Sequence, residues 1–334
     1  MQERQRRADL DRAKGLGILL VVFGHIVARQ PPLDNEWYVA LKNAVYLFHM
    51  PFFMYLSGYV TFLSGAARTM PEDWPKLWLK RARRLLVPFA IFGLAIVAGK
   101  LLLAPYLHVD NAPVSASLAV LALLWNTDAS PAESVWYIAV LFVLCAVTPP
   151  LLALLRGNVG LLLAFALALY LSPAPHVMYL DRVASFYVFF VLGGLAADLG
   201  ERWLRALDLC APWFLAMLLA AVTAALAFGD SLNRASMFLL CGLISMPALH
   251  GLVRRPRWYR SKFLLTVGSY SFAIYLLNTP CIGLAKALLW KLNTWNGERF
   301  LLYAPVLMVV GTLAPILIKT LLLKRVPAFD SITQ

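Results

Sequence analysis

Apolar segments long enough to cross a lipid bilayer follow one another along almost the whole chain, and this feature limits the fold more than any other. A bilayer core takes about 20 apolar residues per helix, with a range of roughly 17 to 25. Because 61% of the 334 residues are hydrophobic and 14% are charged, too little polar surface remains to coat a soluble globule. The sequence therefore predicts an all-α, polytopic integral membrane protein with a single transmembrane domain over residues 1–334.

The ten expected spans lie near residues 15–30, 41–64, 84–106, 134–155, 157–172, 183–200, 210–228, 234–253, 264–290 and 299–323. Among them, the segment 157–172 is short for a full span. A further apolar segment, residues 114–125, is shorter still and fits an interfacial or re-entrant piece.

Basic residues are distributed unevenly between the expected connections. With the N-terminus inside, 22 of the 30 lysines and arginines lie on the inner side, and the other 8 lie outside or within spans. The stretch 108–133 has no lysine or arginine but carries Asp110, Asp128 and Glu133, as an outer loop should. We therefore expect both termini to be cytoplasmic. We interpret the excess of 30 basic over 17 acidic residues as a topology signal and not as a nucleic-acid-binding surface.

Cysteines are few and scattered. Cys145, Cys210, Cys241 and Cys281 lie in or beside apolar runs and show no C-x-x-C spacing. This pattern favours buried apolar side chains over a disulfide framework or a metal site, so we expect no metal cofactor.

Two histidines lie within the first two expected spans. Lys14 and His25 are 11 residues apart, which is three helical turns and about 16 Å on one face. His49 lies about 12 Å from the outer end of the second span and His25 about 7 Å from that of the first, so the two are at similar depth. Intramembrane histidines often serve only helix packing. Imidazole is, however, the side chain best suited to taking and returning a proton near neutral pH.

The fourth expected span begins on the outer side with Glu133, Trp136 and Tyr137. An aromatic belt at the membrane interface explains Trp136 and Tyr137 as well as a substrate site does. Glu133 is at the depth of the histidines, where a carboxylate can orient an imidazole.

Polar residues recur at helical spacing in the ninth expected span. Ser271, Tyr275 and Asn278 follow at i, i+4 and i+7, just before Thr279 and Pro280. Hydrogen bonds between helices explain them as well as a substrate-lined cavity does.

On the inner side, residues 80–84 place four cations at the start of the third expected span, among them Arg81 and Arg84. Attraction to phospholipid headgroups is one explanation. Guanidinium forks equally suit a phosphorylated cofactor that arrives from the cytoplasm.

Several of these stretches resemble a known family. Residues 11–25, DRAKGLGILLVVFGH, resemble the opening helix of the membrane acyltransferase-3 family, and residues 48–59, FHMPFFMYLSGY, look like its second helix. Further matches in order are Arg81-x-x-Arg84-Leu85-Leu86-x-Pro88-Phe89, Trp136-Tyr137, Phe189-Phe190-x-Leu192-Gly193-Gly194 and Ser271-x-x-Ile274-Tyr275-Leu276.

The resemblance implies a ten-helix enzyme of the cell inner membrane that moves an acyl group, often acetyl from acetyl-CoA, onto an extracytoplasmic sugar or glycan. Many members have arginine where this chain has Lys14, which keeps the charge but loses the planar fork. Many also have histidine where this chain has Asn278. The implied partners are the glycan acceptor and the bilayer, and the sequence leaves a homo-oligomer open.

The candidate site follows from these residues together. His25 is the expected base or transient acyl acceptor, because a hydroxyl is a poor nucleophile until its proton is removed. His49 would polarise the thioester carbonyl or hold the acceptor hydroxyl, with Glu133 as an orienting carboxylate. The expected donor-binding cations are Lys14, Arg81 and Arg84, and the expected substrate-binding residues are Trp136, Tyr137, Tyr275 and Asn278. Direct transfer and a covalent acyl-histidine remain open.

Two other classes of protein also place polar groups within the membrane. A transporter or flippase of a lipid-linked sugar or small anion predicts inverted-repeat halves, and the histidine-bearing motifs occur only once. A membrane scaffold or sensor predicts that both histidines tolerate replacement. The sequence therefore favours the O-acyltransferase.

Overall fold

The computed structural model describes residues 8–27, 35–106, 109, 111–228, 231–292, 297–327, 330 and 333. All regular elements in these ranges are helices. The α-helices are α1 (Ala8–His25), α2 (Glu36–Tyr46), α3 (His49–Leu63), α4 (Trp74–Leu103), α5 (Ala116–Leu124), α6 (Trp136–Leu154), α7 (Val159–Leu171), α8 (Leu180–Leu199), α9 (Glu201–Phe228), α10 (Arg234–Arg254), α11 (Pro256–Tyr259), α12 (Lys262–Ser269), α13 (Ser271–Leu292) and α14 (Gly297–Leu321). Short 3-10 helices lie at Ala66–Arg68, Pro71–Asp73, Thr127–Ala129, Glu133–Val135 and Leu323–Arg325.

Within the described ranges, 7 helical segments are long and apolar enough to cross a membrane. They are Pro71–Leu103, Glu133–Leu154, Leu180–Leu199, Glu201–Phe228, Arg234–Arg254, Ser271–Lys291 and Gly297–Arg325. The helical fold expected of a membrane protein is therefore confirmed for the described residues, whereas the number of ten spans and the side on which the termini lie stay predictions. Helix α7 is apolar but shorter, and the nine residues of α5 are too few to span.

The structure divides two of the expected spans. Residues 41–64 belong to α2 and α3, which are separated at Leu47 and Phe48. Pro51 is the third residue of α3 and has no N–H to donate to the carbonyl of Leu47, so the helix restarts just ahead of it. Residues 264–290 likewise divide into α12 and α13 at Tyr270.

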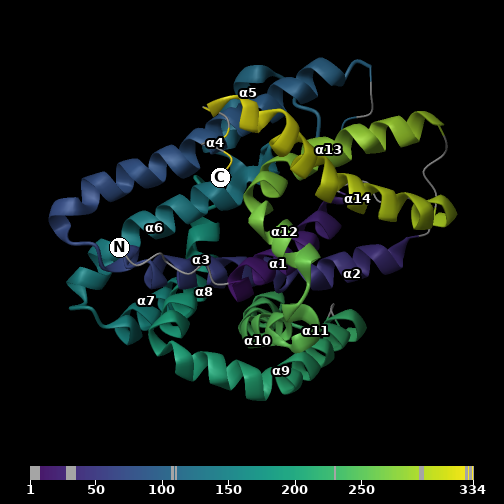
Figure 1. Ribbon diagram of the computed structural model, residues 1–334. Helices are drawn as coiled ribbons and strands as arrows, with labels where there is room; N and C mark the ends of the chain where they lie inside the picture. The colour runs from purple at the N-terminus through teal and green to yellow at the C-terminus, as the bar shows by residue number, and fades with distance from the viewer. Residues whose placement is uncertain are drawn as a thin grey trace.

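Helix α1 is central in the fold. It packs against α2, α3, α10, α12, α13 and α14. In Figure 1, α4 and α5 lie toward one edge of the molecule and α9 and α10 toward the other, with α1 between them. The contact with α12 is backbone to backbone, because a Cβ on Gly15 would lie 2.2 Å from the Leu264 carbonyl oxygen and one on Gly268 would lie 1.7 Å from that of Asp11. Small residues allow such close approach in membrane proteins.

An ion network fixes the N-terminal end of α1 to α10 and α9. The Asp9 carboxylate lies 3.1 Å from Nη1 of Arg254, and Arg254 also binds Asp208 through two hydrogen bonds of 2.8 and 2.7 Å. The buried His250 places Nε2 3.6 Å from Asp9 and Nδ1 2.8 Å from the Tyr55 hydroxyl. Burial raises the pKa of the Asp9 carboxyl, but the hydrogen bond and charge of His250 and the charge of Arg254 outweigh it and lower that pKa below its usual 3.8.

Candidate functional site

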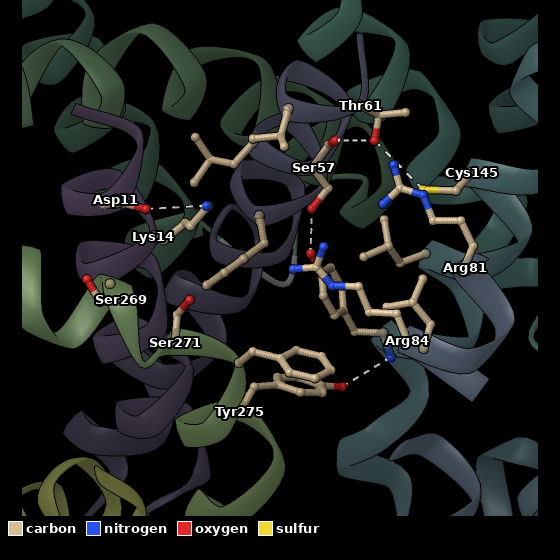
Figure 2. Close-up of a pocket in the computed structure, with 18 residues that line it drawn as sticks. Asp11, Lys14, Ser57, Thr61, Arg81, Arg84, Cys145, Ser269, Ser271 and Tyr275 are labelled. Carbon is tan, nitrogen blue, oxygen red and sulfur yellow. Dashed lines mark hydrogen bonds and ion pairs between the residues drawn. The ribbon is translucent and has the colours of Figure 1, made fainter. Parts of the chain in front are cut away.

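A cavity of about 430 Å³ lies among α1, α3, α4, α6, α12 and α13 (Figure 2). Each of the longer helices lines it with residues three or four positions apart, as on α3 with Phe53, Leu56, Ser57 and Val60. Residues at these spacings share one face of a helix, so a continuous stripe of α3 faces the cavity. The same rule applies to Arg81, Arg84 and Leu85 on α4.

Three of the expected donor-binding cations line this cavity together. Lys14 comes from α1, and Arg81 and Arg84 come from α4; Figure 2 shows the lysine and the two arginines on opposite sides. Lys14 Nζ lies 3.5 Å from Asp11 Oδ1. Neither arginine has a carboxylate partner among the residues that the structure describes. With three cations and one carboxylate, the cavity suits a polyanion.

Asn278 orients His25. The Nδ1 atom of His25 lies 2.6 Å from Oδ1 of Asn278. The amide Nδ2 of Asn278 donates to the carbonyls of Ile274 and Tyr275 at 2.7 and 2.9 Å, which turns its oxygen toward the histidine. An amide oxygen can only accept, so Nδ1 of His25 carries the hydrogen. In the neutral ring, Nε2 is therefore the basic nitrogen.

His49 has the same tautomer for a similar reason. Its Nδ1 lies 2.9 Å from the backbone oxygen of Val45, which can only accept a hydrogen bond. Nε2 is again the basic nitrogen of the neutral ring. The two histidines are close enough to interact electrostatically, although they come from different helices. Tyr46, whose ring centroid lies 4.9 Å from that of His49, donates to the Gly24 carbonyl at 2.9 Å and so ties α2 to the end of α1.

The histidines lie beyond one end of the cavity. On α3, His49 precedes the cavity residue Phe53 by one turn, or about 6 Å of rise. On α13, Asn278 follows the cavity residue Tyr275 by one turn, about 4.5 Å, and contacts His25. On α1, the 11 residues from Lys14 to His25 span about 16 Å. The expected residues thus form two adjacent groups, one around the cations and one around the histidines.

Glu133 forms an ion pair with Arg182, whereas a contact with a histidine was expected. Its Oε1 lies 3.2 Å from Nη2 of Arg182, and the Arg182 guanidinium lies 4.8 Å from the centre of the Trp136 ring. Glu133 still interacts electrostatically with His25, but the hydrogen bond that orients this ring comes from Asn278. Asn278, expected to bind substrate, is fully buried, and its amide contacts protein groups: His25, Thr279 and the carbonyls of Ile274 and Tyr275.

Tyr137 and Tyr275 meet at the end of the cavity that faces the histidines. The Tyr137 hydroxyl lies 2.6 Å from Ser57 Oγ, and the Tyr137 backbone N–H donates to the Tyr275 hydroxyl at 3.2 Å. The second bond satisfies one of the N–H groups that the first turn of α6 leaves without a helical partner.

Sequence reasoning missed two residues of this site. Ser57 lies inside the motif that resembles the family, but its polar side chain drew no separate interpretation. Arg182 is one of the 8 basic residues that lie outside the inner connections, and its partner Glu133 is 49 residues away. A lone arginine at the start of an apolar span is the signal that could have identified it.

No group of three or more metal-ligating side chains occurs in the part of the chain that the structure describes. The fold and the site define a helical membrane protein in which a cation-lined cavity ends beside two histidines. Comparison with known families agrees with this geometry: the family model described as "Acyltransferase domain" matches residues 7–320. The chain belongs to this acyltransferase-3 family.

Two curated relatives are similar to this chain. Nodulation protein NolL of Sinorhizobium fredii is 27% identical over 199 residues, which cover 59% of this chain and 50% of that protein. Nodulation protein NolL of Mesorhizobium japonicum is 27% identical over 197 residues, which cover 58% of this chain and 48% of that protein. The matched region thus spans about half the length of these relatives. No solved structure matches the chain significantly.

Proposed function

We propose that this protein is a transmembrane O-acyltransferase that moves an acetyl group from cytoplasmic acetyl-CoA to a hydroxyl of an extracytoplasmic sugar, polysaccharide or glycolipid. The observation that carries the proposal is a cavity lined by three cations with two histidines beyond one end: His49 lies one turn past it on α3, and His25 contacts Asn278, one turn past it on α13. The cations would bind an anion at one depth, and the histidines would transfer a proton at another.

The membrane setting of the proposal comes from the charge distribution. The whole chain forms one domain of ten spans in the cell inner membrane, with both termini in the cytoplasm. Lys14, Arg81 and Arg84 then face the cytoplasmic side, where acyl-CoA is available. His25 and His49 lie toward the outer side, where the glycan acceptor is available.

The cavity suits the charged part of the donor. Its phosphates would pair with Lys14, Arg81 and Arg84, and charge-assisted hydrogen bonds of this kind contribute about 1.5 to 3 kcal/mol each. From these cations the pantetheine arm would run toward the histidines. The rise of about 16 Å from Lys14 to His25 is the distance that it has to cover.

His25 is the proposed general base. Its Nε2 removes the proton of the acceptor hydroxyl while the hydroxyl oxygen attacks the thioester carbonyl. The tetrahedral intermediate then expels the CoA thiolate, which receives the same proton from His25 and leaves as the thiol. Asn278 keeps Nδ1 protonated throughout, so that Nε2 alone exchanges the proton. A transient acyl-histidine would require the same unprotonated Nε2 as its nucleophile.

For His49, the tautomer supports one of two roles. A neutral ring with its hydrogen on Nδ1 has no N–H left to polarise a carbonyl oxygen, because Val45 receives that hydrogen. Nε2 can instead accept a hydrogen bond from the acceptor hydroxyl. We therefore assign His49 to holding the acceptor hydroxyl.

The test uses purified protein reconstituted into proteoliposomes, with radiolabelled acetyl-CoA and a membrane glycan fraction as acceptor. Ester-linked label should appear in the glycan only when donor and acceptor are on opposite sides of the bilayer. Profiles of ester-linked acetyl groups on the cell surface, with and without the protein, should differ in the same way. Transfer that occurs with both substrates on one side, or no change in surface acetylation, would contradict the proposal.

A further inference from the structure

Three aromatic rings line the end of the cavity that faces the histidines. Phe53 of α3 packs against Tyr137 of α6 with 5.9 Å between ring centroids, and Tyr137 packs against Tyr275 of α13 with 5.4 Å. We call these three rings the aromatic layer. All three also line the cavity, and Figure 2 shows Tyr275 at the far end of the view from Thr61.

Hydrogen bonds hold the aromatic layer across its helices. The contact of 2.6 Å between Ser57 Oγ and the Tyr137 hydroxyl fixes the second ring to α3. The bond of 3.2 Å from the Tyr137 N–H to the Tyr275 hydroxyl fixes the third ring to α6. Phe53 is the one ring of the layer that has no polar atom, and it is therefore the one held by packing alone.

The order of residues along two helices places the aromatic layer between the cavity and the histidine site. On α3, Ser57 lines the cavity, Phe53 belongs to the layer, and His49 follows one turn further. On α13, Ser271 lines the cavity and Tyr275 belongs to the layer. Asn278 comes next and contacts His25.

The other two helices, α1 and α6, are consistent with this order. On α1, Lys14 lines the cavity and Gly17 backs onto the Phe53 ring, whereas His25 lies about 12 Å further along the helix. On α6, Leu141 lines the cavity and lies one turn from the layer residue Tyr137. On α3 and α13, which carry residues of both groups, the aromatic layer thus lies between the cavity and the histidine site.

Gly17 leaves room for the Phe53 ring against α1. A Cβ at this position would lie 2.7 Å from Cε2 of Phe53, which is closer than carbon atoms approach in proteins. The ring can occupy its place against α1 because the glycine has no side chain. Displacement of Phe53 is the simplest way to open the layer, and its range depends on this contact.

We propose that the aromatic layer is a width filter for the acyl group, with Phe53 as the residue that determines specificity and Gly17 as the residue that positions it. The proposal rests on the function proposed above. Because the acyl end of the donor leads toward the histidines, it is the first part to pass the rings. An unbranched acyl group needs a narrow opening, whereas a branch next to the carbonyl carbon needs a wider one.

Butanoyl-CoA and 2-methylpropanoyl-CoA are the matched pair of donors that tests this filter. They have the same number of carbons and differ only in branching, so that hydrophobicity does not separate them. With acetyl-CoA as the reference donor, the parent protein should prefer butanoyl over 2-methylpropanoyl in kcat/KM by about 10-fold to 200-fold, the usual effect of one misplaced methyl group in a pocket.

Phe53→Ala should reduce this preference to within about threefold, because truncation of the ring opens the layer. Leu141→Ala is the control: it enlarges the cavity but leaves the layer intact, so the preference should stay as in the parent. Gly17→Ala should increase the preference, since its methyl group pushes the Phe53 ring toward the opening.

The outcomes separate the two proposals. If no acyl-CoA supports transfer by the parent protein, the proposed function fails. If acetyl is transferred but the parent uses the two four-carbon donors equally, or Phe53→Ala and Leu141→Ala change their ratio to the same extent, the width filter alone is overturned. If Phe53→Ala does not fold, Phe53→Leu provides the same comparison with a smaller widening.

Discussion

Replacement of Asn278 by leucine tests the proposed role of Asn278 in fixing the tautomer of His25. Leucine is close in size to asparagine but has no acceptor for the hydrogen on Nδ1 of His25, which now forms a 2.6 Å contact with Oδ1. A buried donor without a partner costs about 1 to 3 kcal/mol. The ring can avoid this cost by moving its hydrogen to Nε2, and Nε2 is then no longer the basic nitrogen that the proposed mechanism needs.

Either response lowers the rate of the chemical step. A loss of about 1 to 3 kcal/mol corresponds to a fall in kcat of roughly 5-fold to 150-fold. The cations that would bind CoA lie about 16 Å along α1 from His25, so the Kd for CoA should stay within about twofold of the parent value. Steady-state kinetics and calorimetry on the same preparation give both quantities.

Thr279→Val is the matched control. Thr279 Oγ1 donates to the same Asn278 oxygen, but at 3.4 Å, which is a weak hydrogen bond. Its loss should change kcat by less than about twofold. A parental kcat in Asn278→Leu, or equal losses in both variants, would refute the idea that Asn278 fixes the His25 tautomer.

Three further predictions concern the donor, the ion network and the topology. Arg84→Ala should weaken CoA binding by at least about 10-fold in calorimetry, and binding to the parent should weaken with added salt; equal affinity in the variant would exclude this donor site. Asp9→Asn should destabilise the protein by about 1 to 3 kcal/mol because Arg254 and His250 lose their charged partner. The pKa of Asp9 lies below its usual 3.8, so the carboxylate is ionised at neutral pH. The difference in unfolding midpoint between the parent and Asp9→Asn should therefore shrink only in acid. An unchanged midpoint at pH 7 would argue against the network. A cysteine at the exposed position Ala112 should react with an impermeant thiol reagent in intact cells, and protection would reverse the predicted topology.

Local periodicity explains what the sequence could predict. The 11-residue spacing of Lys14 and His25 defines a face of one helix whatever surrounds it, and α1 carries both residues. The apolar runs likewise predict helices because a bilayer leaves few other backbone structures possible. The charges at 81 and 84 belong to the first half of α4, on the face that lines the cavity.

Contacts between distant segments were beyond these arguments. Asn278 and His25 are 253 residues apart, and no spacing rule connects them. The sequence predicted a carboxylate partner for the imidazole, and Glu133 was the nearest carboxylate by expected depth. Depth along the membrane normal does not define which helices are neighbours. The atom that contacts Nδ1 of His25 comes from Asn278 of α13, and not from Glu133 in the 3-10 helix before α6.

The divided spans have a related explanation. Hydropathy averages over about 19 residues and does not respond to a break of one or two residues. Pro51 was a visible signal for the break before α3, since it removes a helical hydrogen bond. The break at Tyr270 has no such local cause, and the helices on either side of it, α12 and α13, both pack against α1.

The most direct test of the central claim is acetyl transfer by His25→Ala and His25→Gln, measured beside CoA binding in the same reconstituted preparation. If Nε2 of His25 is the base, both variants should transfer less than about a tenth of the parental acetyl, since an amide cannot accept a proton near pH 7. Both should bind CoA nearly as the parent does. Transfer above that level by either variant, with intact CoA binding, would contradict the claim that this histidine performs the proton transfer.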